Sequence, residues 1–435
     1  MTAAASPPPS AWTTGTWWLL DRVFILGSAA IVQVVIAREL GPASLGELSY
    51  VLAIVAMSLP LARMGLSGLL VKSLLASPPA HHEILETALA WRLSAVLAVS
   101  AVALAWLPLG TTGILALSLF GVALQLTEYS AQARETPRDV IPARLTIVTI
   151  AALGKILAAH ETQDPRLVAW IFAAEYATQG LWQWRIYLQL TKTVLAPKAH
   201  STWSRHFSLR TPWLLLASVA EAIYLKVDIL MLQHFRSAAE VGTYALAARL
   251  SEIWYALPQL AMIALFPRLW RQRETSETAW RAGLQASMDG LFWIAVLVAL
   301  ATQVLAEPLI LWIFGKAFTG SIDVLTLHIW AGIFVFTRAL ISRFILAEDL
   351  IRLAFWSQGS GAVVNIALNW WLIPRYGPIG AAWATLISYA VAGWLVFFLH
   401  PKTRWMASSV VRAALLPLRW RDIRQYGAAW SAKRR

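Results

Sequence analysis

The stretch from Pro212 to Gln233 reads PWLLLASVAEAIYLKVDILMLQ, an apolar run that carries charges in its interior. A helix of about 20 apolar residues spans the hydrocarbon core of a bilayer. Glu221, Lys226 and Asp228 lie inside this run. An ionised side chain at the bilayer centre costs at least about 2.5–3.5 kcal/mol, so such residues usually face a bundle interior or a water-filled cavity. The run therefore predicts a transmembrane helix whose charged side chains face a bundle interior or a water-filled cavity.

The next apolar run, from Val241 to Phe266, carries Arg249 and Glu252. Residues three positions apart share a helical face, so this pair predicts either a local ion pair or a site that faces a cavity. Charged residues in both helices of one hairpin predict the start of the second half of a transporter. Pro60 and Pro258 predict bends in the second and eighth membrane spans.

The composition outside this hairpin indicates a membrane protein throughout. Of 435 residues, 58% are hydrophobic and only 14% are charged, whereas soluble domains carry about 25% charged residues. The net charge of +13 lies mainly in short loops and the tail, which indicates membrane orientation rather than nucleic-acid binding. The absence of cysteine from the sequence excludes disulfides and thiolate metal sites.

Apolar windows of about 20 residues predict an all-α polytopic protein of about twelve transmembrane helices. We expect a flexible N-terminus (1–16), a first lobe (17–190), a cytoplasmic linker (191–211), a second lobe (212–400) and a basic cytoplasmic tail (401–435). The expected spans are 17–37, 47–70, 85–107, 112–133, 143–160, 166–190, 212–233, 241–266, 285–306, 322–346, 352–373 and 378–399.

Elements of the sixth expected span recur in the twelfth, each 213 residues later. The recurrence predicts two six-helix lobes of the same topology, related by a pseudo-twofold axis along the membrane normal. The matching elements are Ala169-Trp170, Tyr176-Ala177 and Gly180 in the first half, and Ala382-Trp383, Tyr389-Ala390 and Gly393 in the second.

Basic residues predict the orientation. With the N-terminus inside, the inner loops and the tail hold most of the lysines and arginines, so we expect both termini in the cytoplasm. We place the protein in a bacterial inner (plasma) membrane. The tail from Lys402 to Arg435 predicts either an amphipathic helix on anionic lipid or a plain topological anchor.

Candidate site residues come from both halves. Glu221, Tyr224 and Asp228 share one helical face, which predicts either a polar stripe facing a cavity or an interhelical salt bridge. Arg63 lies in the span that the repeat pairs with the Arg249 span, so two related arginines predict a cationic cavity. Lys155 and Glu175, in the fifth and sixth spans, predict a structural ion pair between neighbouring helices.

Enzyme and metal motifs are missing from the sequence. It contains no Walker loop, no GxGxxG, no HExxH and no long outer loop with paired carboxylates. Adjacent His81 and His82 do not share a helical face, so we expect no metal site there. The sequence therefore predicts a protein that is not an enzyme and holds no metal or cofactor, apart from a coupling H⁺ or Na⁺.

Several motifs then resemble one family. The chain resembles the polysaccharide-biosynthesis (O-antigen-type oligosaccharide) flippases of the multidrug, oligosaccharidyl-lipid and polysaccharide exporter superfamily, from about Arg22 to His400. The motifs that carry the resemblance are Lys226-Val-Asp-Ile-Leu-Met-Leu, Val241-Gly242-Thr-Tyr244-Ala-Leu-Ala-Ala-Arg249-Leu, Leu265-Phe-Pro267-Arg268, Ala-Phe318 after Phe314-Gly315, Asn365, Asn369, and Ile373-Pro374-Arg375-Tyr376-Gly377-Pro-Ile-Gly380.

The resemblance implies a flippase that moves a polyprenyl-pyrophosphate-linked oligosaccharide from the inner to the outer leaflet by alternating access. It implies a V-shaped pair of lobes with spans one, two, seven and eight around the cavity. Its partners would be the lipid-linked oligosaccharide, membrane lipids, and the polymerase and glycosyltransferases of the same pathway. We expect Arg63, Tyr224, Lys226 and Arg249 to bind substrate. Glu221, Asp228, Glu252, Lys155 and Glu175 are candidates for ion or proton coupling or for structural pairing.

Three rival interpretations stay open. A cation-coupled drug exporter of the same superfamily has an acidic, aromatic cavity, whereas the charges here are of both signs. A peptidoglycan-precursor flippase usually has two more spans. A membrane polymerase or ligase needs a large outer loop with catalytic Arg or His.

Overall fold

The structure, a computed structural model, describes residues 11–419, which form α-helices joined by short 3-10 turns and loops. The predicted flexible N-terminus lies outside this range up to residue 10, and the chain is helical from Ala11. The helices are α1 (Ala11–Arg63), α2 (Ser67–Ala76), α3 (His81–Trp106), α4 (Leu109–Leu124), α5 (Thr127–Arg134), α6 (Ile141–Thr162), α7 (Pro165–Thr191), α8 (Ser201–Phe235), α9 (Ala238–Glu252), α10 (Ala256–Thr275), α11 (Glu277–Ile313), α12 (Ser321–His328), α13 (Gly332–Ala347), α14 (Ile351–Gly393) and α15 (Arg404–Ala414).

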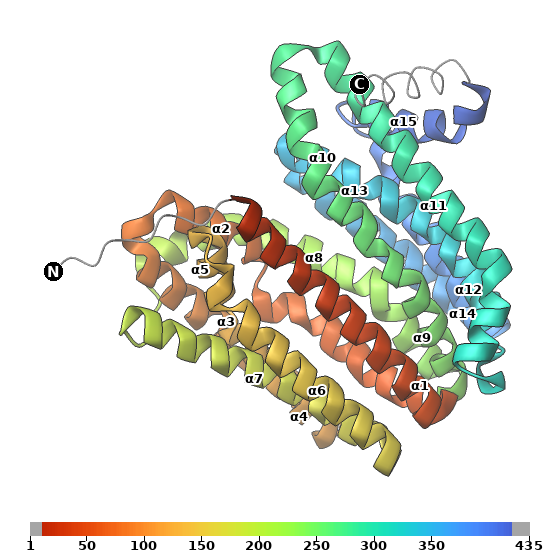
Figure 1. The fold of residues 1–435 in the computed structure, drawn as a ribbon, viewed down its shortest axis with the longest axis horizontal. Coiled ribbons are helices and arrows are strands. Elements are labelled where there is room, and N and C mark those ends of the chain that lie inside the picture. Colours follow the sequence, from red (N-terminus) through yellow and green to blue (C-terminus); the bar gives the residue numbers. More distant parts are fainter. Residues whose placement is uncertain (1–10, 420–435) are drawn as a thin grey trace. The chain divides into compact units, whose positions relative to one another are not determined.

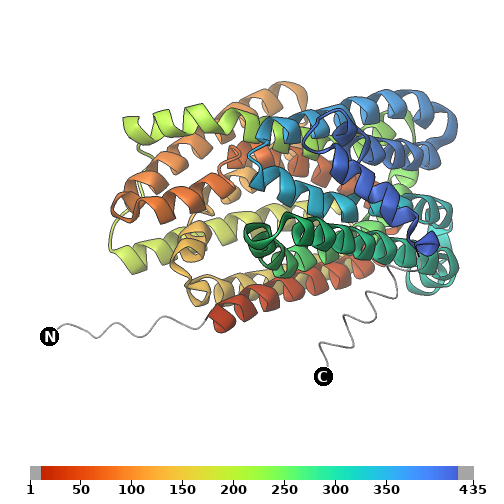
Figure 2. The same cartoon turned by 90° about the horizontal axis from the view of Figure 1, so that it is seen from above.

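The chain forms two compact units, Met1–Gln233 and His234–Arg435. In the first unit α4 packs along α7, and α6 packs along α1 (Figure 1). In the second unit α11 packs against α10, α13 and α15, while α12 packs against α9 and α14. Figure 2 shows the helices within each unit running side by side. The predicted lobe boundary, which assigns 212–233 to the second lobe, stays a prediction.

Membrane-length helices account for the apolar composition. Within residues 11–419, seven helical stretches are long and apolar enough to cross a membrane. Two of them, Gly15–Ala76 and Arg352–Phe398, span 62 and 47 residues and each contains a turn, so each supplies two of the predicted spans. Helices α7, α8 and α9 with α10 occupy three further predicted spans. The all-α polytopic prediction is confirmed.

Glycines make the two sharp turns possible. Gly41 in α1 has φ 69° and Gly377 in α14 has φ 56°, values at which a side chain would be strained. The turn in α14 frees backbone carbonyls, and Arg236 donates to two of them, Ile373 O at 3.1 Å and Pro374 O at 2.9 Å. The last-hairpin motif of the family resemblance therefore serves turn formation within the second unit.

The internal repeat is visible in the packing of each unit. A Cβ on Gly180 would collide with the backbone of Gly121, so α7 crosses α4 at closest approach there. A Cβ on Gly393 would press at 3.1 Å on the Phe334 backbone, where α14 crosses α13. Gly121 and Phe334 are 213 residues apart, as are Gly180 and Gly393. The two halves therefore share the same crossing at equivalent positions.

Helix breaks differ from the predicted bends. Helix α1 continues through Pro60 and ends at Arg63, and the chain breaks at Met64 and Gly65, which both have positive φ. A Cβ on Gly65 would lie 2.7 Å from the Leu215 nitrogen of α8, so glycine is required for this close approach. The helix therefore ends shortly after Pro60, and the bend predicted at Pro60 itself stays a prediction.

The tail forms an amphipathic helix, α15, but its apolar face is buried by protein. Met406, Ala407, Val410 and Ala413 belong to the hydrophobic core of the second unit. The indole of Trp293 donates to the Ala413 carbonyl at 2.9 Å. This part of the tail therefore anchors to the fold, and the predicted tail beyond Arg419 lies outside the described residues.

Candidate functional site

The predicted polar stripe on α8 lies in the first unit. Asp228 and Tyr224 are buried, with 3% and 5% of their surface exposed. Lys226 is half-buried and Glu221 is exposed. The stripe therefore runs from the interior of the unit towards its surface, and the roles of its members stay predictions.

Arg63 also belongs to the first unit, whereas Arg249 and Glu252 lie on α9 of the second. Arg249 is exposed and Glu252 is half-buried. That residues of both units share one cavity stays a prediction. The arrangement within the first unit does place Arg63 at the break between α1 and α2, in a half-buried position.

Lys155 and Glu175 form the ion pair that their neighbouring spans predict. The Lys155 ammonium donates to Glu175 Oε2, and their side chains are 7% and 15% exposed. The ammonium also lies 3.7 Å from the centre of the Phe172 ring. Gln179 donates to the other carboxylate oxygen at 3.1 Å. The pair joins α6 to α7 with its charges well compensated, as expected of a structural contact.

A buried arginine that we did not predict lies near Arg63. Arg92 of α3 is fully buried, and its guanidinium lies 5.1 Å from the centre of the Tyr129 ring. Its Nη1 donates weakly to Gln125 O at 3.4 Å, while Nε and Nη2 have no hydrogen-bond partner among the described residues. Arg63 interacts electrostatically with the same tyrosine. The sequence does offer a signal for Arg92, because a charged residue within an apolar span usually faces the protein interior.

A second unpredicted cluster fixes the start of α1. Asp21 is buried and accepts two hydrogen bonds from Arg144, at 3.0 and 2.6 Å. Arg144 also pairs with Glu128 at 3.1 Å. These three residues tie α1, α5 and α6 together, and their bidentate geometry indicates a structural role.

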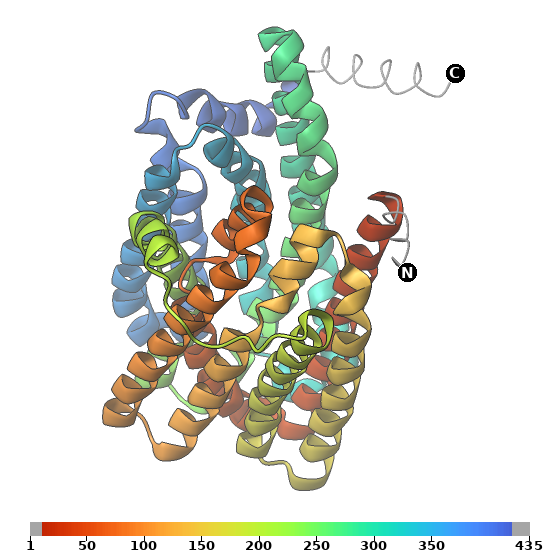
Figure 3. The same ribbon diagram turned by 90° about the vertical axis from the view of Figure 1, so that its left-hand side faces the viewer.

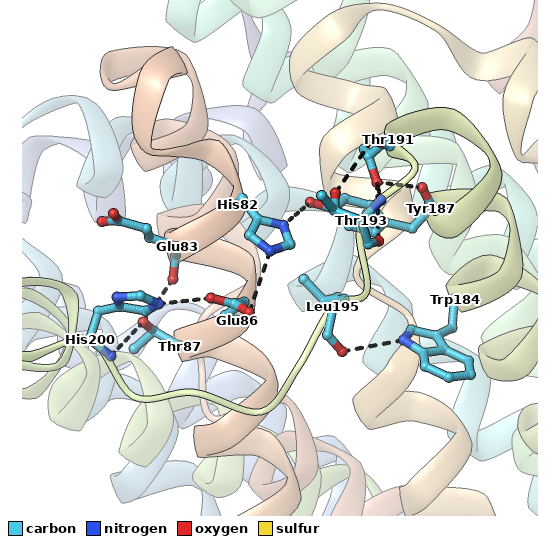
Figure 4. A network of polar contacts seen from close by, with 10 residues as sticks. All are labelled: His82, Glu83, Glu86, Thr87, Trp184, Tyr187, Thr191, Thr193, Leu195 and His200. Atoms are coloured by element: carbon cyan, nitrogen blue, oxygen red, sulfur yellow. Dashed lines mark hydrogen bonds and ion pairs between the residues drawn. The ribbon is translucent and has the colours of Figure 1, made fainter.

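A third cluster holds the segment that joins α7 to α8 (Figure 4). Glu86 of α3 is buried and contacts His82 at 3.4 Å and His200 at 2.8 Å. His82 also hydrogen-bonds the Tyr187 hydroxyl at 2.7 Å. The His200 backbone donates to Thr87 Oγ1 at 3.2 Å. These contacts pin the segment that Figure 3 shows crossing the ends of the helices, and they fix where α8 begins.

Two polar ladders occupy the second unit. Asn369 donates to Asn365 at 2.9 Å, and Asn365 donates to Ser388 at 3.1 Å, so the two arms of α14 are joined. The Tyr244 hydroxyl lies 3.2 Å from Thr385 Oγ1 and links α9 to α14. The asparagines of the family motif therefore serve packing. Among residues 11–419, acidic and histidine side chains form no cluster that could hold a metal ion.

Comparison with known proteins supports the resemblance. No protein-family model matches the sequence. Over 178 residues the chain is 24% identical to the probable low-salt glycan biosynthesis flippase Agl15 of Haloferax volcanii, covering 40% of this chain and 38% of Agl15. Over 216 residues it is 26% identical to the probable flippase AglR of the same organism, covering 49% of this chain and 45% of AglR. The chain thus aligns with less than half the length of these curated relatives.

Solved structures match nearly the whole chain. The lipid II flippase MurJ in an inward closed conformation aligns over 93% of this chain and 91% of its own, with a TM-score of 0.66 and 16% identity. An inward-facing MATE family transporter of the MOP superfamily aligns over 89% and 96%, with a TM-score of 0.57 and 10% identity. The chain therefore has the same fold as these two solved transporters. These relatives and neighbours are flippases and transporters rather than enzymes, in agreement with the sequence analysis.

Proposed function

We propose that the protein flips a polyprenyl-pyrophosphate-linked oligosaccharide from the inner to the outer leaflet by alternating access, for surface polysaccharide export. One observation carries the proposal: the relatives Agl15 and AglR and the solved structure of MurJ are all named flippases. One relative is named for glycan biosynthesis and the structure for lipid II, so a lipid-linked glycan is the substrate class they share. No covalent bond is made or broken in this step.

Intramembrane cations support an anionic substrate. Arg63, Lys226 and Arg249 would supply positive potential for the pyrophosphate, and fixed charge offsets the hydration that the anion loses. Arg92 strengthens this proposal in the first unit, because two of its donors are unsatisfied by the described residues. Asp228 and Glu221 would take up a coupling H⁺ or Na⁺ or hold the bases in place.

The same fold serves multidrug MATE transporters, so a cation-coupled exporter of small cationic drugs is the second candidate. A buried Arg92, with Arg63 acting on the same Tyr129, disfavours a cationic substrate beside these residues, because like charges repel. A peptidoglycan-precursor flippase is the third candidate, supported by the match to MurJ. The orientation with both termini in the cytoplasm of a bacterium belongs to this proposal.

A deletion strain tests the step that is performed. Loss of a flippase leaves the lipid-linked oligosaccharide complete but stranded on the inner leaflet, because the flippase acts after synthesis. Extraction and mass analysis of the lipid-linked sugars measure whether the oligosaccharide is complete. A shortened or absent lipid-linked oligosaccharide would contradict the proposal, because it indicates an enzyme.

Arg249 tests the proposed cavity. Arg249→Ala is expected to leave the membrane level near normal and to abolish export, because arginine grips phosphate oxygens bidentately. Arg249→Lys is expected to restore export only in part. The swap of Arg249→Glu with Glu252→Arg separates the two interpretations: restored export would show a structural ion pair and contradict the binding role.

A further inference from the structure

A basic pocket lies at the end of the first unit where α2 faces the first turns of α8. Its volume is about 500 Å³. Lys72 of α2 and Arg205, His206 and Arg210 of α8 line it, and no carboxylate does. None of these four side chains forms an ion pair with a described residue. The pocket therefore concentrates uncompensated positive charge on one side of one unit.

A buried hydroxyl in the lining is also unsatisfied. Ser73 is only 4% exposed, lines the pocket, and its Oγ has no hydrogen-bond partner among the described residues. Leaving a buried polar group unpaired is unfavourable, so an acceptor atom from a ligand would be stabilised here. A phosphate oxygen accepts hydrogen bonds from hydroxyl and guanidinium donors alike.

Most of the remaining lining is apolar, which suits an amphiphile. Leu69, Ala76, Trp203 and Leu209 are its apolar members, Ser77 and Thr202 are its polar members, and Leu209 is 72% exposed at the surface. An exposed leucine on a membrane helix suits contact with acyl chains. A basic pocket between membrane helices with apolar walls is typical of sites for anionic lipid headgroups.

The neighbouring cluster holds this wall in place. His200 and Glu86 pin the segment that leads into α8 (Figure 4), and Phe207 is fully buried in the core against Trp91. The first turns of α8 therefore have fixed positions relative to α2. Backbone N–H groups at this helix start add a favourable dipole for an anion.

We propose that this pocket binds the phosphate group of an anionic membrane lipid, with Arg205, Arg210 and Lys72 as cationic partners and Ser73 as a hydrogen-bond donor. The pocket is separate from Arg63 and the other residues proposed to bind the transported substrate. It docks lipid where the predicted inner leaflet meets the protein. The inference stands on the pocket itself, and only the leaflet depends on the orientation given under the proposed function.

The test uses the full chain in nanodiscs. The sequence has no cysteine, so a single Leu209→Cys labelled with an environment-sensitive fluorophore reports on the pocket alone. Increasing the fraction of phosphatidylglycerol in phosphatidylcholine nanodiscs is expected to give a saturable emission change. Arg205→Gln with Arg210→Gln is expected to raise the half-saturating fraction roughly five-fold per charge, which corresponds to about 1 kcal/mol each.

Two further variants separate a pocket from diffuse charge. Ser73→Ala removes only an unsatisfied hydroxyl, so it is expected to weaken binding about three-fold without lowering the protein level. Lys192→Gln with Lys198→Gln removes two charges from the adjacent segment outside the lining, and it is expected to leave binding unchanged. Equal weakening in this control would overturn the inference.

Inorganic pyrophosphate in pure phosphatidylcholine nanodiscs distinguishes the source of the phosphate. No response at concentrations that saturate a soluble anion site supports a lipid; a response to pyrophosphate with none to phosphatidylglycerol overturns the assignment. Binding needs no transport, so failure here is distinct from failure of the proposed function. A protein that binds phosphatidylglycerol but does not flip the lipid-linked oligosaccharide would contradict only the proposed function.

Discussion

Breaking the pair between Lys155 and Glu175 tests whether it is structural or part of ion coupling. Lys155→Met keeps the length of the side chain and its contact with Phe172, but leaves Glu175 with the hydrogen bond from Gln179 and no ammonium partner. Removing one partner of a buried pair costs about 3–5 kcal/mol. Because Glu175 is 15% exposed and keeps the hydrogen bond from Gln179, we expect the lower end, about 3 kcal/mol.

The double variant Lys155→Met with Glu175→Gln removes both charges. Because no uncompensated charge remains, its unfolding free energy is expected to return to within about 1 kcal/mol of the wild-type value. Reversible unfolding in mixed micelles measures all four proteins of the cycle. Lys198 is an exposed lysine of the segment that joins α7 to α8, so Lys198→Met is the control and is expected to change stability by less than about 0.5 kcal/mol.

Two results would refute this reasoning. A loss below about 1 kcal/mol in Lys155→Met, or a double variant as unstable as the single one, would show that the charges do not stabilise each other. Transport by the folded double variant then separates the roles. Normal export is expected for a structural pair, whereas abolished export would assign the pair to coupling.

Three further predictions follow from the packing and the charges. Gly121→Ala is expected to lower the protein level sharply, since its Cβ would collide with the backbone of α7. Gly110→Ala on the same helix is the control and is expected to be tolerated, since its Cβ would meet no atom within 4 Å. Quantitative immunoblots of membranes compare the two variants, and equal protein levels would refute the close crossing of α4 and α7. Burial and the Arg210 charge lower the pKa of His206 below its usual value of 6.5, so this imidazole gains its charge only in acid. Phosphatidylglycerol binding, which Lys72 and Arg205 also face, is therefore expected to strengthen as the pH falls below 6.5. A His206→Gln variant that keeps the same pH dependence would contradict this prediction. An impermeant thiol reagent is expected to label a cysteine at Thr162 in whole cells and not one at Arg271; the reverse pattern would refute the predicted orientation.

Much of the helix layout follows from sequence because apolar length and period are local properties. The spans, the Gly180 and Gly393 recurrence and the Lys155–Glu175 pair all depend on neighbouring or repeated elements. The break at Gly65 was not predictable, since it depends on the close approach of α8. A membrane helix also tolerates the loss of the backbone hydrogen bond that proline removes.

Contacts between remote helices were missed for a similar reason. Arg144 and Asp21 are 123 residues apart, and His200 and Glu86 are 114 residues apart. No sequence spacing indicates such partners; only the tertiary packing brings them together. Arg92 was detectable as a charge within an apolar span, but its open donors become apparent only when its neighbours are placed.

Flipping by the purified protein tests the central claim most directly. The protein is reconstituted in liposomes that carry a fluorescent polyprenyl-pyrophosphate-linked oligosaccharide in both leaflets, and a membrane-impermeant reductant bleaches the outer leaflet. Continued bleaching of the inner pool measures transfer between leaflets. We expect near-complete bleaching with the wild-type protein, and about half both with protein-free liposomes and with Arg249→Ala, because this variant abolishes transfer. Bleaching that stops at half with the folded wild-type protein, together with efflux of a cationic dye from the same liposomes, would contradict the flippase and favour the drug exporter.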